Sequence, residues 1–120
     1  MANNRIAGVA FVKVDGRQYD LRGSFTVSPS AFKREGIAGQ DRVHGFAETP
    51  RVPYVAADLS TTAGLSVAEL DAMDDVTVTV ELANGLNYVL TQAWTVSAHE
   101  IDTAAGKVAV RWEGVDCTEI

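Results

Sequence analysis

Residues 76–96, VTVTVELANGLNYVLTQAWTV, decide the fold class of this chain. The first seven alternate apolar and polar side chains without an error, which is typical of a β-strand with one buried face. The dipeptide Asn84-Gly85 follows, and it is the one most typical of a two-residue hairpin turn. We expect one face of the returning strand to carry four apolar residues, Tyr88, Leu90, Trp94 and Val96. This stretch therefore predicts an antiparallel hairpin.

Strand patterns also lie on both sides of this hairpin. Residues 6–14 are apolar and β-branched, and they end at a second hairpin dipeptide, Asp15-Gly16. The chain returns over residues 17–27, and residues 107–113 alternate again with two valines and a tryptophan on one face. These segments favour strands that pair mainly with their neighbours in the sequence.

Glycine and proline mark where the other strands are interrupted. Gly23 predicts a β-bulge within the returning strand. Residues 50–59 also look extended, but Pro50 and Pro53 cannot donate to a sheet ladder. We therefore expect an edge strand or a strand start at these prolines.

One window, residues 66–73, has helical periodicity. Ser66 at the N-cap and Glu69 three residues later form a capping box, and one apolar stripe follows at helical spacing. Residues 1–120 are thus expected to form one domain. The predicted fold is mainly β, an antiparallel β-sandwich or open barrel of about six strands with one short flanking helix.

The composition excludes several classes of protein. The net charge is −6, from 16 acidic and 10 basic residues, and this argues against tight nucleic-acid binding, which depends on Lys and Arg. No apolar run approaches the roughly 20 residues of a membrane helix, so we expect no membrane partner. The N-terminus lacks the apolar core of a secretory signal. The single cysteine, Cys117, has no partner for an internal disulfide and no neighbour that would activate it, so we expect a semi-buried apolar side chain.

The chain shows no constellation that is typical of catalysis, metal binding or cofactor binding. His44 and His99 stand alone, without the spaced ligands of a zinc site. We expect His44 to be a surface or interface residue, and His99 with Glu100 to form a solvated strand end. Asp74 and Asp75 are expected to form a solvated turn. We therefore predict no catalytic residue, no cofactor and no metal ion.

Residues 33–54, KREGIAGQDRVHGFAETPRVPY, form a long insert between strand patterns. Connections in compact domains usually have about 4–6 residues, and much longer ones are usually functional or disordered. Apolar residues interrupt the polar ones here, which argues against disorder. We expect a partly mobile loop, at about 33–49, that becomes ordered by docking onto another copy of the chain. Its candidate contact residues are Lys33, Arg34, Glu35, Ile37, Asp41, Arg42, His44 and Phe46.

Four stretches of the chain resemble the Mu-like family of bacteriophage tail tube proteins. The insert with its flanks, VSPSAFKREGIAGQDRVHGFAETPRVPYV, carries the most specific likeness in its GQD, HG and PRVP elements. The others are NRIAGVAFVKVDG, ELANGLNYVLTQAWT and AGKVAVRWEGVDCTEI, so the likeness covers nearly the whole chain. Arg42 and Cys117 lie outside the shared pattern. The resemblance implies a structural protein and not an enzyme.

The resemblance further implies hexameric rings whose sheets join into one continuous barrel, and rings stacked into a tube inside a contractile sheath. The implied partners are further copies of the chain, the tail sheath, the baseplate and the terminator. DNA would pass through the lumen during ejection without specific binding. The implied location is the virion, after assembly in the host cytoplasm. Because the chain is acidic, we expect a lumen that repels phosphate, with Glu48, Asp58 and Glu81 as candidates.

Three alternatives remain open. A tube subunit of a tailocin or of a type VI-like secretion device would share the same fold. A monomeric β-sandwich binding module would be expected to expose aromatic residues on loops, whereas Trp94 and Trp112 lie in strand patterns. A small hydrolase would need clustered histidines and carboxylates, which the sequence does not offer.

Overall fold

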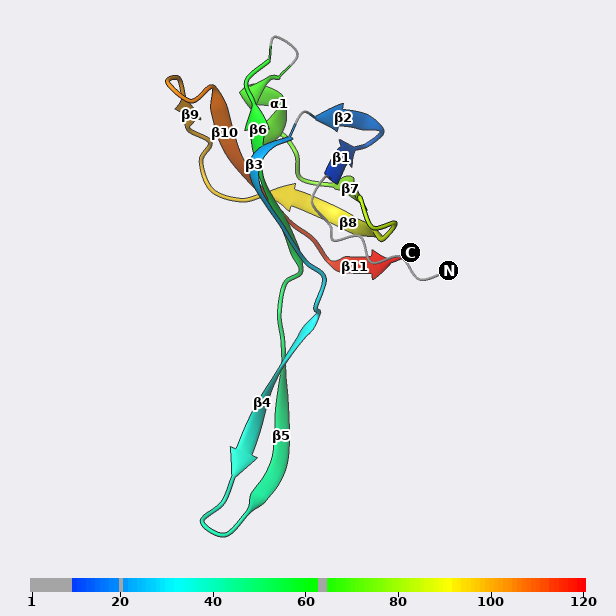
Figure 1. Cartoon of the computed structure of the whole chain (residues 1–120), viewed down its shortest axis with the longest axis vertical. Helices are drawn as coiled ribbons and strands as arrows, with labels where there is room; N and C mark the ends of the chain where they lie inside the picture. Colours follow the sequence, from blue (N-terminus) through cyan, green and yellow to red (C-terminus); the bar gives the residue numbers. More distant parts are fainter. Residues whose placement is uncertain (1–9, 20, 63–64) are drawn as a thin grey trace.

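The computed structural model describes residues 10–19, 21–62 and 65–120, and within these ranges the chain is mainly β (Figure 1). The described elements are, in order, β1 (Ala10–Val14), β2 (Arg17–Tyr19), β3 (Leu21–Ser28), β4 (Phe32–Ala38), β5 (Val43–Pro50), β6 (Tyr54–Ser60), α1 (Val67–Asp71), β7 (Val76–Leu82), β8 (Asn87–Thr95), β9 (Ile101–Asp102), β10 (Lys107–Glu113) and β11 (Asp116–Glu119). The predicted mainly β fold with one short helix is confirmed. The predicted number of strands was too low, because short strands such as β9 and β11 carry no recognisable alternation.

The strands form two antiparallel layers. Sheet A contains β2, β1, β7, β11 and most of β8. Sheet B contains β3, β6, β10 and β9. The last residues of β8 pair with β10, so the two sheets share one edge and the strand order runs β2-β1-β7-β8-β10-β6-β3. In Figure 1 the strands of sheet A run across those of sheet B, as in a sheet folded over onto itself.

The hydrophobic core lies between the two sheets. Every second residue of β6 and of β10 is buried, and Val55, Leu59 and Trp112 have no exposed surface. These side chains join the buried valines of β1 and β7 in one cluster, and Leu70 of α1 adds to it. The alternation leaves each sheet with one outward face, and these outward faces are the surfaces available for other contacts.

Strand β8 changes the face that it buries partway along. Gln92 has a positive φ of 49°, and the pairing of β8 with β7 shifts register near it. Leu90 is buried before this bulge and Ala93 is buried after it, whereas Trp94 is only partly buried. The prediction that Leu90 and Trp94 share one face is therefore wrong, since one extra residue in a strand moves the later side chains to the opposite face.

The insert is a β-hairpin and not a loop, which corrects the sequence-based expectation. Strands β4 and β5 pair from Phe32 opposite Pro50 to Ala38 opposite Val43. Every residue of both strands is exposed, so no alternation of buried and exposed positions marks them in the sequence. In Figure 1 the hairpin continues β3 and β6 and points away from both sheets along the longest axis of the molecule, which measures 61 × 41 × 28 Å overall.

Several local sequence signals are confirmed. Both predicted hairpin dipeptides connect paired strands, and the pairing of β3 with β6 shifts register around the predicted bulge. The hydroxyl of Ser66 caps α1 by accepting a hydrogen bond from the backbone N–H of Glu69. Pro53 immediately precedes β6 as expected, whereas Pro50 ends β5.

Candidate assembly surface

The two faces of the β4–β5 hairpin carry different side chains. One face presents Phe32, Arg34, Phe46 and Glu48, because residues directly opposite each other in antiparallel strands point to the same side. Arg34 Nε donates to Glu48 Oε1 at 2.7 Å, and the Arg34 guanidinium lies 5.3 Å from the centre of the Phe46 ring. This face therefore combines exposed aromatic rings with a preformed ion pair.

The opposite face of the hairpin carries Lys33, Glu35 and Ile37. Lys33 Nζ lies 3.0 Å from Glu35 Oε1, and both side chains are largely exposed. An exposed ion pair of this kind adds little to stability because water screens it. The predicted contact residues are thus all on the hairpin, but they are divided between its two faces and its tip.

The tip of the hairpin is shaped by the packing of His44 on Gly39. A Cβ atom at position 39 would overlap the imidazole ring of His44, so the ring occupies space that only glycine leaves open. The backbone N–H of Gly39 donates to the carbonyl of Arg42 at 2.7 Å, and His44 Nε2 lies 3.5 Å from Asp41 Oδ1. The tip therefore brings together Asp41, Arg42 and His44, three of the predicted contact residues.

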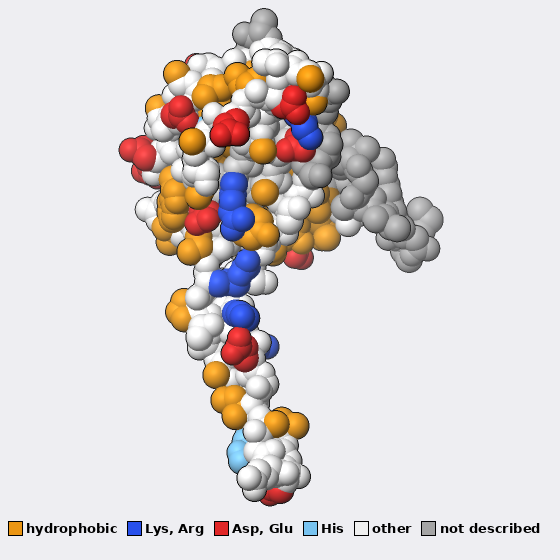
Figure 2. Space-filling view, turned by 90° about the vertical axis from the view of Figure 1, so that its left-hand side faces the viewer, with side chains coloured by type: hydrophobic (Ala, Val, Ile, Leu, Met, Phe, Trp, Pro, Cys, Tyr) orange, Lys and Arg blue, Asp and Glu red, His pale blue; other side chains and the backbone are white. Residues whose placement is uncertain are grey.

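The hairpin exposes several large apolar side chains. The exposed fraction is 73% for Val43, 61% for Phe46 and 58% for Phe32. Figure 2 shows hydrophobic side chains along the projecting arm, well away from the body of the molecule. A two-stranded hairpin on its own is only marginally stable in water, and it cannot bury such side chains by itself.

Two arginines flank one tyrosine at the root of the hairpin. The guanidinium of Arg111 lies 3.8 Å from the centre of the Tyr54 ring, and that of Arg51 lies 5.7 Å from it. Arg51 Nη1 also donates to Ser28 Oγ at 2.7 Å and to the carbonyl of Ser30 at 2.9 Å. These contacts hold the Arg51 guanidinium in a fixed position. Sequence reasoning missed this cluster because Arg111, Ser28 and Ser30 come from other segments of the chain than Arg51 and Tyr54, at no characteristic spacing.

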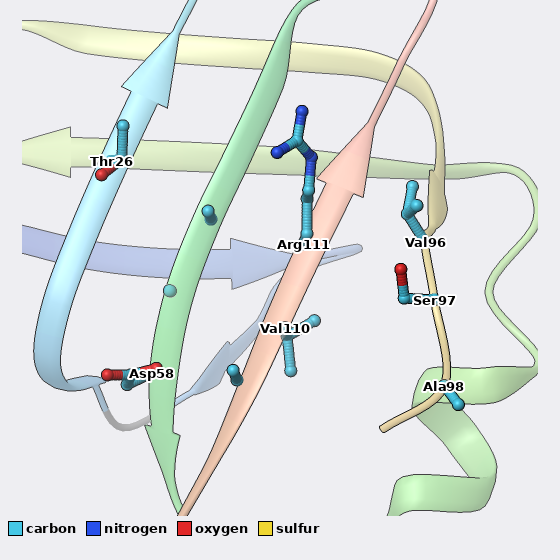
Figure 3. A pocket seen from close by; sticks show the side chains of 10 residues that line it. Thr26, Asp58, Val96, Ser97, Ala98, Val110 and Arg111 are labelled. Atoms are coloured by element: carbon cyan, nitrogen blue, oxygen red, sulfur yellow. The ribbon is translucent and has the colours of Figure 1, made fainter. Parts of the chain in front are cut away.

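The outward face of sheet B carries a hollow of about 290 Å³ beside the segment 96–98. Figure 3 shows that Thr26 of β3, Asp58 of β6 and Arg111 of β10 line it, with Val96 and Ser97 on the adjacent segment. Small side chains, mostly alanines, form the rest of the lining. The hollow is shallow and polar at both ends, and its described lining residues include no nucleophile paired with a base.

A second hollow, also of about 290 Å³, lies on the same face of sheet B near β9. Its charged lining consists of Asp58, Glu100, Asp102 and Lys107. Lys107 Nζ lies 3.5 Å from Asp58 Oδ2, and the other two carboxylates form no ion pair within the part of the chain that the structure describes. This hollow, which we call the acidic hollow, was also missed by sequence reasoning, since its acids are spread over three segments.

The three lumen candidates do not lie together. Glu48 is on the hairpin and pairs with Arg34. Asp58 lies between buried neighbours of β6, on the outward face of sheet B. Glu81 is on β7 of sheet A, and its Oε1 is 3.7 Å from Lys13 Nζ. Asp58 and Glu81 therefore belong to outward faces of different sheets, and the assignment of these acids to a lumen stays a prediction.

His99 is buried, which corrects the expected solvated strand end. Its side chain is only 1% exposed, and Nδ1 lies 2.5 Å from Oδ1 of Asp71 at the end of α1. The hydroxyl of Thr95 also donates to the carbonyl of Leu70 at 2.7 Å. These contacts tie the segment before β9 to the helix. Glu100 itself is exposed, as are Asp74 and Asp75 in the expected turn.

Cys117 lies on β11 and is partly buried against the core. Burial, with a smaller effect of the Asp116 carboxylate, raises the pKa of the Cys117 thiol. The thiol therefore stays protonated at neutral pH and is a poor nucleophile.

No group of three or more His, Cys, Asp or Glu side chains within residues 10–19, 21–62 and 65–120 is placed to hold a metal ion. No helix among these residues is long and apolar enough to cross a membrane.

The fold and the surface together define a structural β-sandwich protein with a projecting hairpin arm. The chain belongs to the phage tail tube protein family, whose model matches residues 3–119. It is 29% identical over 113 residues to the Mu-like prophage FluMu tail tube protein of Haemophilus influenzae, covering 94% of each chain. It is 27% identical over 110 residues to the tail tube protein of Escherichia phage Mu, covering 92% of this chain and 91% of that one. The resemblance seen in the sequence is confirmed, and the chain is a structural phage tail tube subunit and not an enzyme.

Solved structures with the same fold come from contractile injection systems. The sheath/tube terminator of the extracellular contractile injection system PVC has a TM-score of 0.68 at 8% identity, covering 97% of this chain and 96% of that one. The tube-terminating cap of the anti-feeding prophage has a TM-score of 0.64 at 11% identity, covering 92% of this chain and 87% of that one. At these identities the likeness shows a shared fold.

Proposed function

We propose that this chain forms hexameric rings that stack into the inner tube of a contractile tail, and that DNA passes through the lumen during ejection. Membership of the tail tube family supports the tube, and the similar folds among contractile injection systems support the contractile setting. The tail sheath, the baseplate and the terminator are the partners that such a tube requires. Assembly takes place in the host cytoplasm before the tube becomes part of the virion.

The observation that carries the proposal is the exposed hairpin. Strands β4 and β5 have no buried residue, and yet they carry three large apolar side chains that are more than half exposed, Phe32, Val43 and Phe46. A second copy of the chain is the partner that can cover them in a homopolymer. Open sheet edges favour the same conclusion, because β3 ends the strand order of sheet B and can pair with an edge of a neighbouring copy. Closing six such sheets into a barrel removes the edges.

Deleting residues 37–46 tests this role of the hairpin. The deleted residues are all exposed or half-exposed and lie outside the core, so the body should keep its fold and its stability against urea. We expect the deleted chain to remain folded and to form no stacked tubes, because the apolar face and the tip are gone. Negative-stain imaging and sedimentation at increasing protein concentration measure assembly, and circular dichroism checks the fold.

The wild-type chain is the reference in this experiment. It should give hexameric rings by native mass spectrometry and tubes in negative stain at high concentration. Normal tubes from the deleted chain would show that the hairpin is not the assembly element. A wild-type chain that stays monomeric up to millimolar concentration would instead favour the β-sandwich binding module.

A tube of an injection device, such as a tailocin, is the second candidate. The observation that favours it is the fold shared with the PVC and anti-feeding prophage proteins. The sequence relatives come from a phage and a prophage, so we rank the phage tube first. Imaging particles from cells that produce the chain separates the two, since a phage tube ends at a DNA-filled head and a tailocin tube does not.

A further inference from the structure

Ion pairs involve most of the described Lys and Arg side chains, whereas several described carboxylates have no cationic partner. Among the described cations, Arg42 and Arg51 have no carboxylate partner, and both belong to the hairpin or its root. In the acidic hollow at the other end of sheet B, Glu100 and Asp102 have no cationic partner among the residues described. These two carboxylates lie at the opposite end of sheet B from Arg51. The other described acids without an ion pair, Asp15, Asp74, Asp75, Asp116 and Glu119, do not line this hollow.

The acidic hollow has the chemistry to receive a guanidinium group. Three carboxylates line it against the single ammonium group of Lys107, which leaves an excess of negative charge. Its volume of about 290 Å³ leaves room for the end of a long side chain. Arginine suits such a site because its planar group donates to carboxylates in pairs and is weakly hydrated.

Arg51 is the cation best prepared for such a contact. Its Nη1 is fixed by Ser28 and Ser30, and its guanidinium lies beside the ring of Tyr54. A side chain that is already held in place loses little conformational freedom on binding. Arg42 at the tip has no comparable support among the described contacts.

The two sites lie at opposite ends of one face. The register of β6 with β10 places Tyr54 opposite Glu113 near the hairpin and Ser60 opposite Lys107 near β9. A strand of seven residues, such as β6, spans about 20 Å, so Arg51 cannot reach the acidic hollow of its own chain. Figure 1 shows β9 at the end of the body away from the hairpin, so a head-to-tail stack of the proposed tube would bring the β9 end of one copy toward the hairpin end of the next.

We propose that Arg51 of one copy enters the acidic hollow of the next copy along the stack, where it pairs with Glu100 and Asp102. The proposal rests on the proposed function, since it names the contact that joins one copy to the next. The contact is heterologous, because it joins two different surfaces, and such contacts repeat without limit along a tube. The charges fix the register between rings as well as adding affinity.

Charge reversal at each side tests the contact. Arg51→Glu and Glu100→Arg each place like charges together, so each should raise the protein concentration needed for tube assembly on the order of tenfold. The chain that carries both substitutions restores an opposite pair and should assemble at nearly the wild-type concentration. Arg51→Glu also removes the contacts of Arg51 with Ser28 and Ser30, so thermal unfolding of each variant measures any loss of stability. Glu100→Arg leaves those contacts intact and tests the contact between copies without this effect.

Lys13→Glu is the matched control. It changes the net charge by as much as Arg51→Glu, but Lys13 is on β1 of sheet A and pairs with Glu81. Tubes should form as in the wild type. Normal assembly of both single variants would overturn the proposed contact, and so would a combined variant that does not recover assembly. In either case, tubes formed by the wild-type chain would still support the proposed function. A wild-type chain that never assembles would refute the proposed function and this contact with it.

A nucleic-acid phosphate is the competing ligand for Arg51. Fluorescence anisotropy of a short labelled DNA duplex at low salt measures binding to wild-type tubes and to the variants. We expect no binding that depends on Arg51. Binding that is lost in Arg51→Glu but kept in Glu100→Arg, with both variants assembling normally, would assign Arg51 to phosphate and overturn the contact between copies.

Discussion

Gly114 lies buried just after β10, and a single methyl group there would meet the core. A Cβ atom would lie 2.7 Å from Cγ of Leu90 and 2.9 Å from the carbonyl oxygen of Thr91. Moving the backbone oxygen of Thr91 would require a shift of the main chain, which costs free energy. We therefore expect Gly114→Ala to lower the free energy of unfolding by about 1–3 kcal/mol, as overpacking does elsewhere. Urea denaturation measures the change.

Gly36→Ala is the control for this substitution, because a Cβ atom at Gly36 meets nothing within 4 Å. Its effect should stay within about 0.5 kcal/mol, as for other exposed sites. Equal losses in the two variants would show that the contact with Leu90 is not the cause.

The burial of His99 and the cluster around Tyr54 could not be predicted from the sequence, because both depend on contacts between segments that are distant in the chain. The isolated position of His99 suggested a solvated side chain, yet the fold buries it against Asp71. Arg111 reaches the ring of Tyr54, beside Arg51, only because β6 and β10 pair. Sequence spacing indicates which residues share a strand face, but it does not show which strands become neighbours.

Strand β8 shows at the scale of one element how a bulge decides which side chains are buried. Gln92 has a φ of 49°, a value that β-branched residues strongly avoid and that glycine adopts without steric cost. We expect Gln92→Val to destabilise the fold by about 1–3 kcal/mol, and Gln92→Gly to unfold at or above the wild-type temperature. Thermal unfolding followed by circular dichroism compares the two. If the valine variant were as stable as the glycine variant, the bulge would not require a positive φ.

The elements with a buried face could be predicted from the sequence, and those without one could not. The strand at residues 76–82 was predicted with its observed bounds, because its alternation reports a buried side and an exposed side. The two hairpin dipeptides and the Ser66 cap act locally and were also predicted correctly. Strands β4 and β5 bury nothing within the chain, so the sequence only marked them as an insert that needs a partner.

At the scale of the whole molecule, only one of the two outward faces of the sandwich can line the lumen of the proposed tube. The outward face of sheet B is the better candidate, because β3 and β6 lead into the hairpin and run along the long axis, whereas the strands of sheet A cross it (Figure 1). Strands that line a closed barrel run at about 35–45° to its axis. The pairs Asp58–Lys107 and Arg111–Glu113 also neutralise charges on this face. The acidic hollow adds a net negative charge to the same face, and such a face offers little attraction to phosphate.

Adding one lysine to each outward face tests which of them would face DNA in the proposed tube. Thr26 is exposed on β3 of sheet B, and Thr79 lies between two buried valines of β7 in sheet A, so its side chain points outward. We expect both Thr26→Lys and Thr79→Lys to leave tube assembly largely intact. Only Thr26→Lys should slow DNA ejection, because each ring then presents extra positive charge that attracts the passing phosphates. Ejection from particles built with each variant is followed by the fluorescence of a dye that binds released DNA. Slow ejection with Thr79→Lys alone would place sheet A at the lumen, and normal ejection with both variants would show that lumen charge does not control DNA passage.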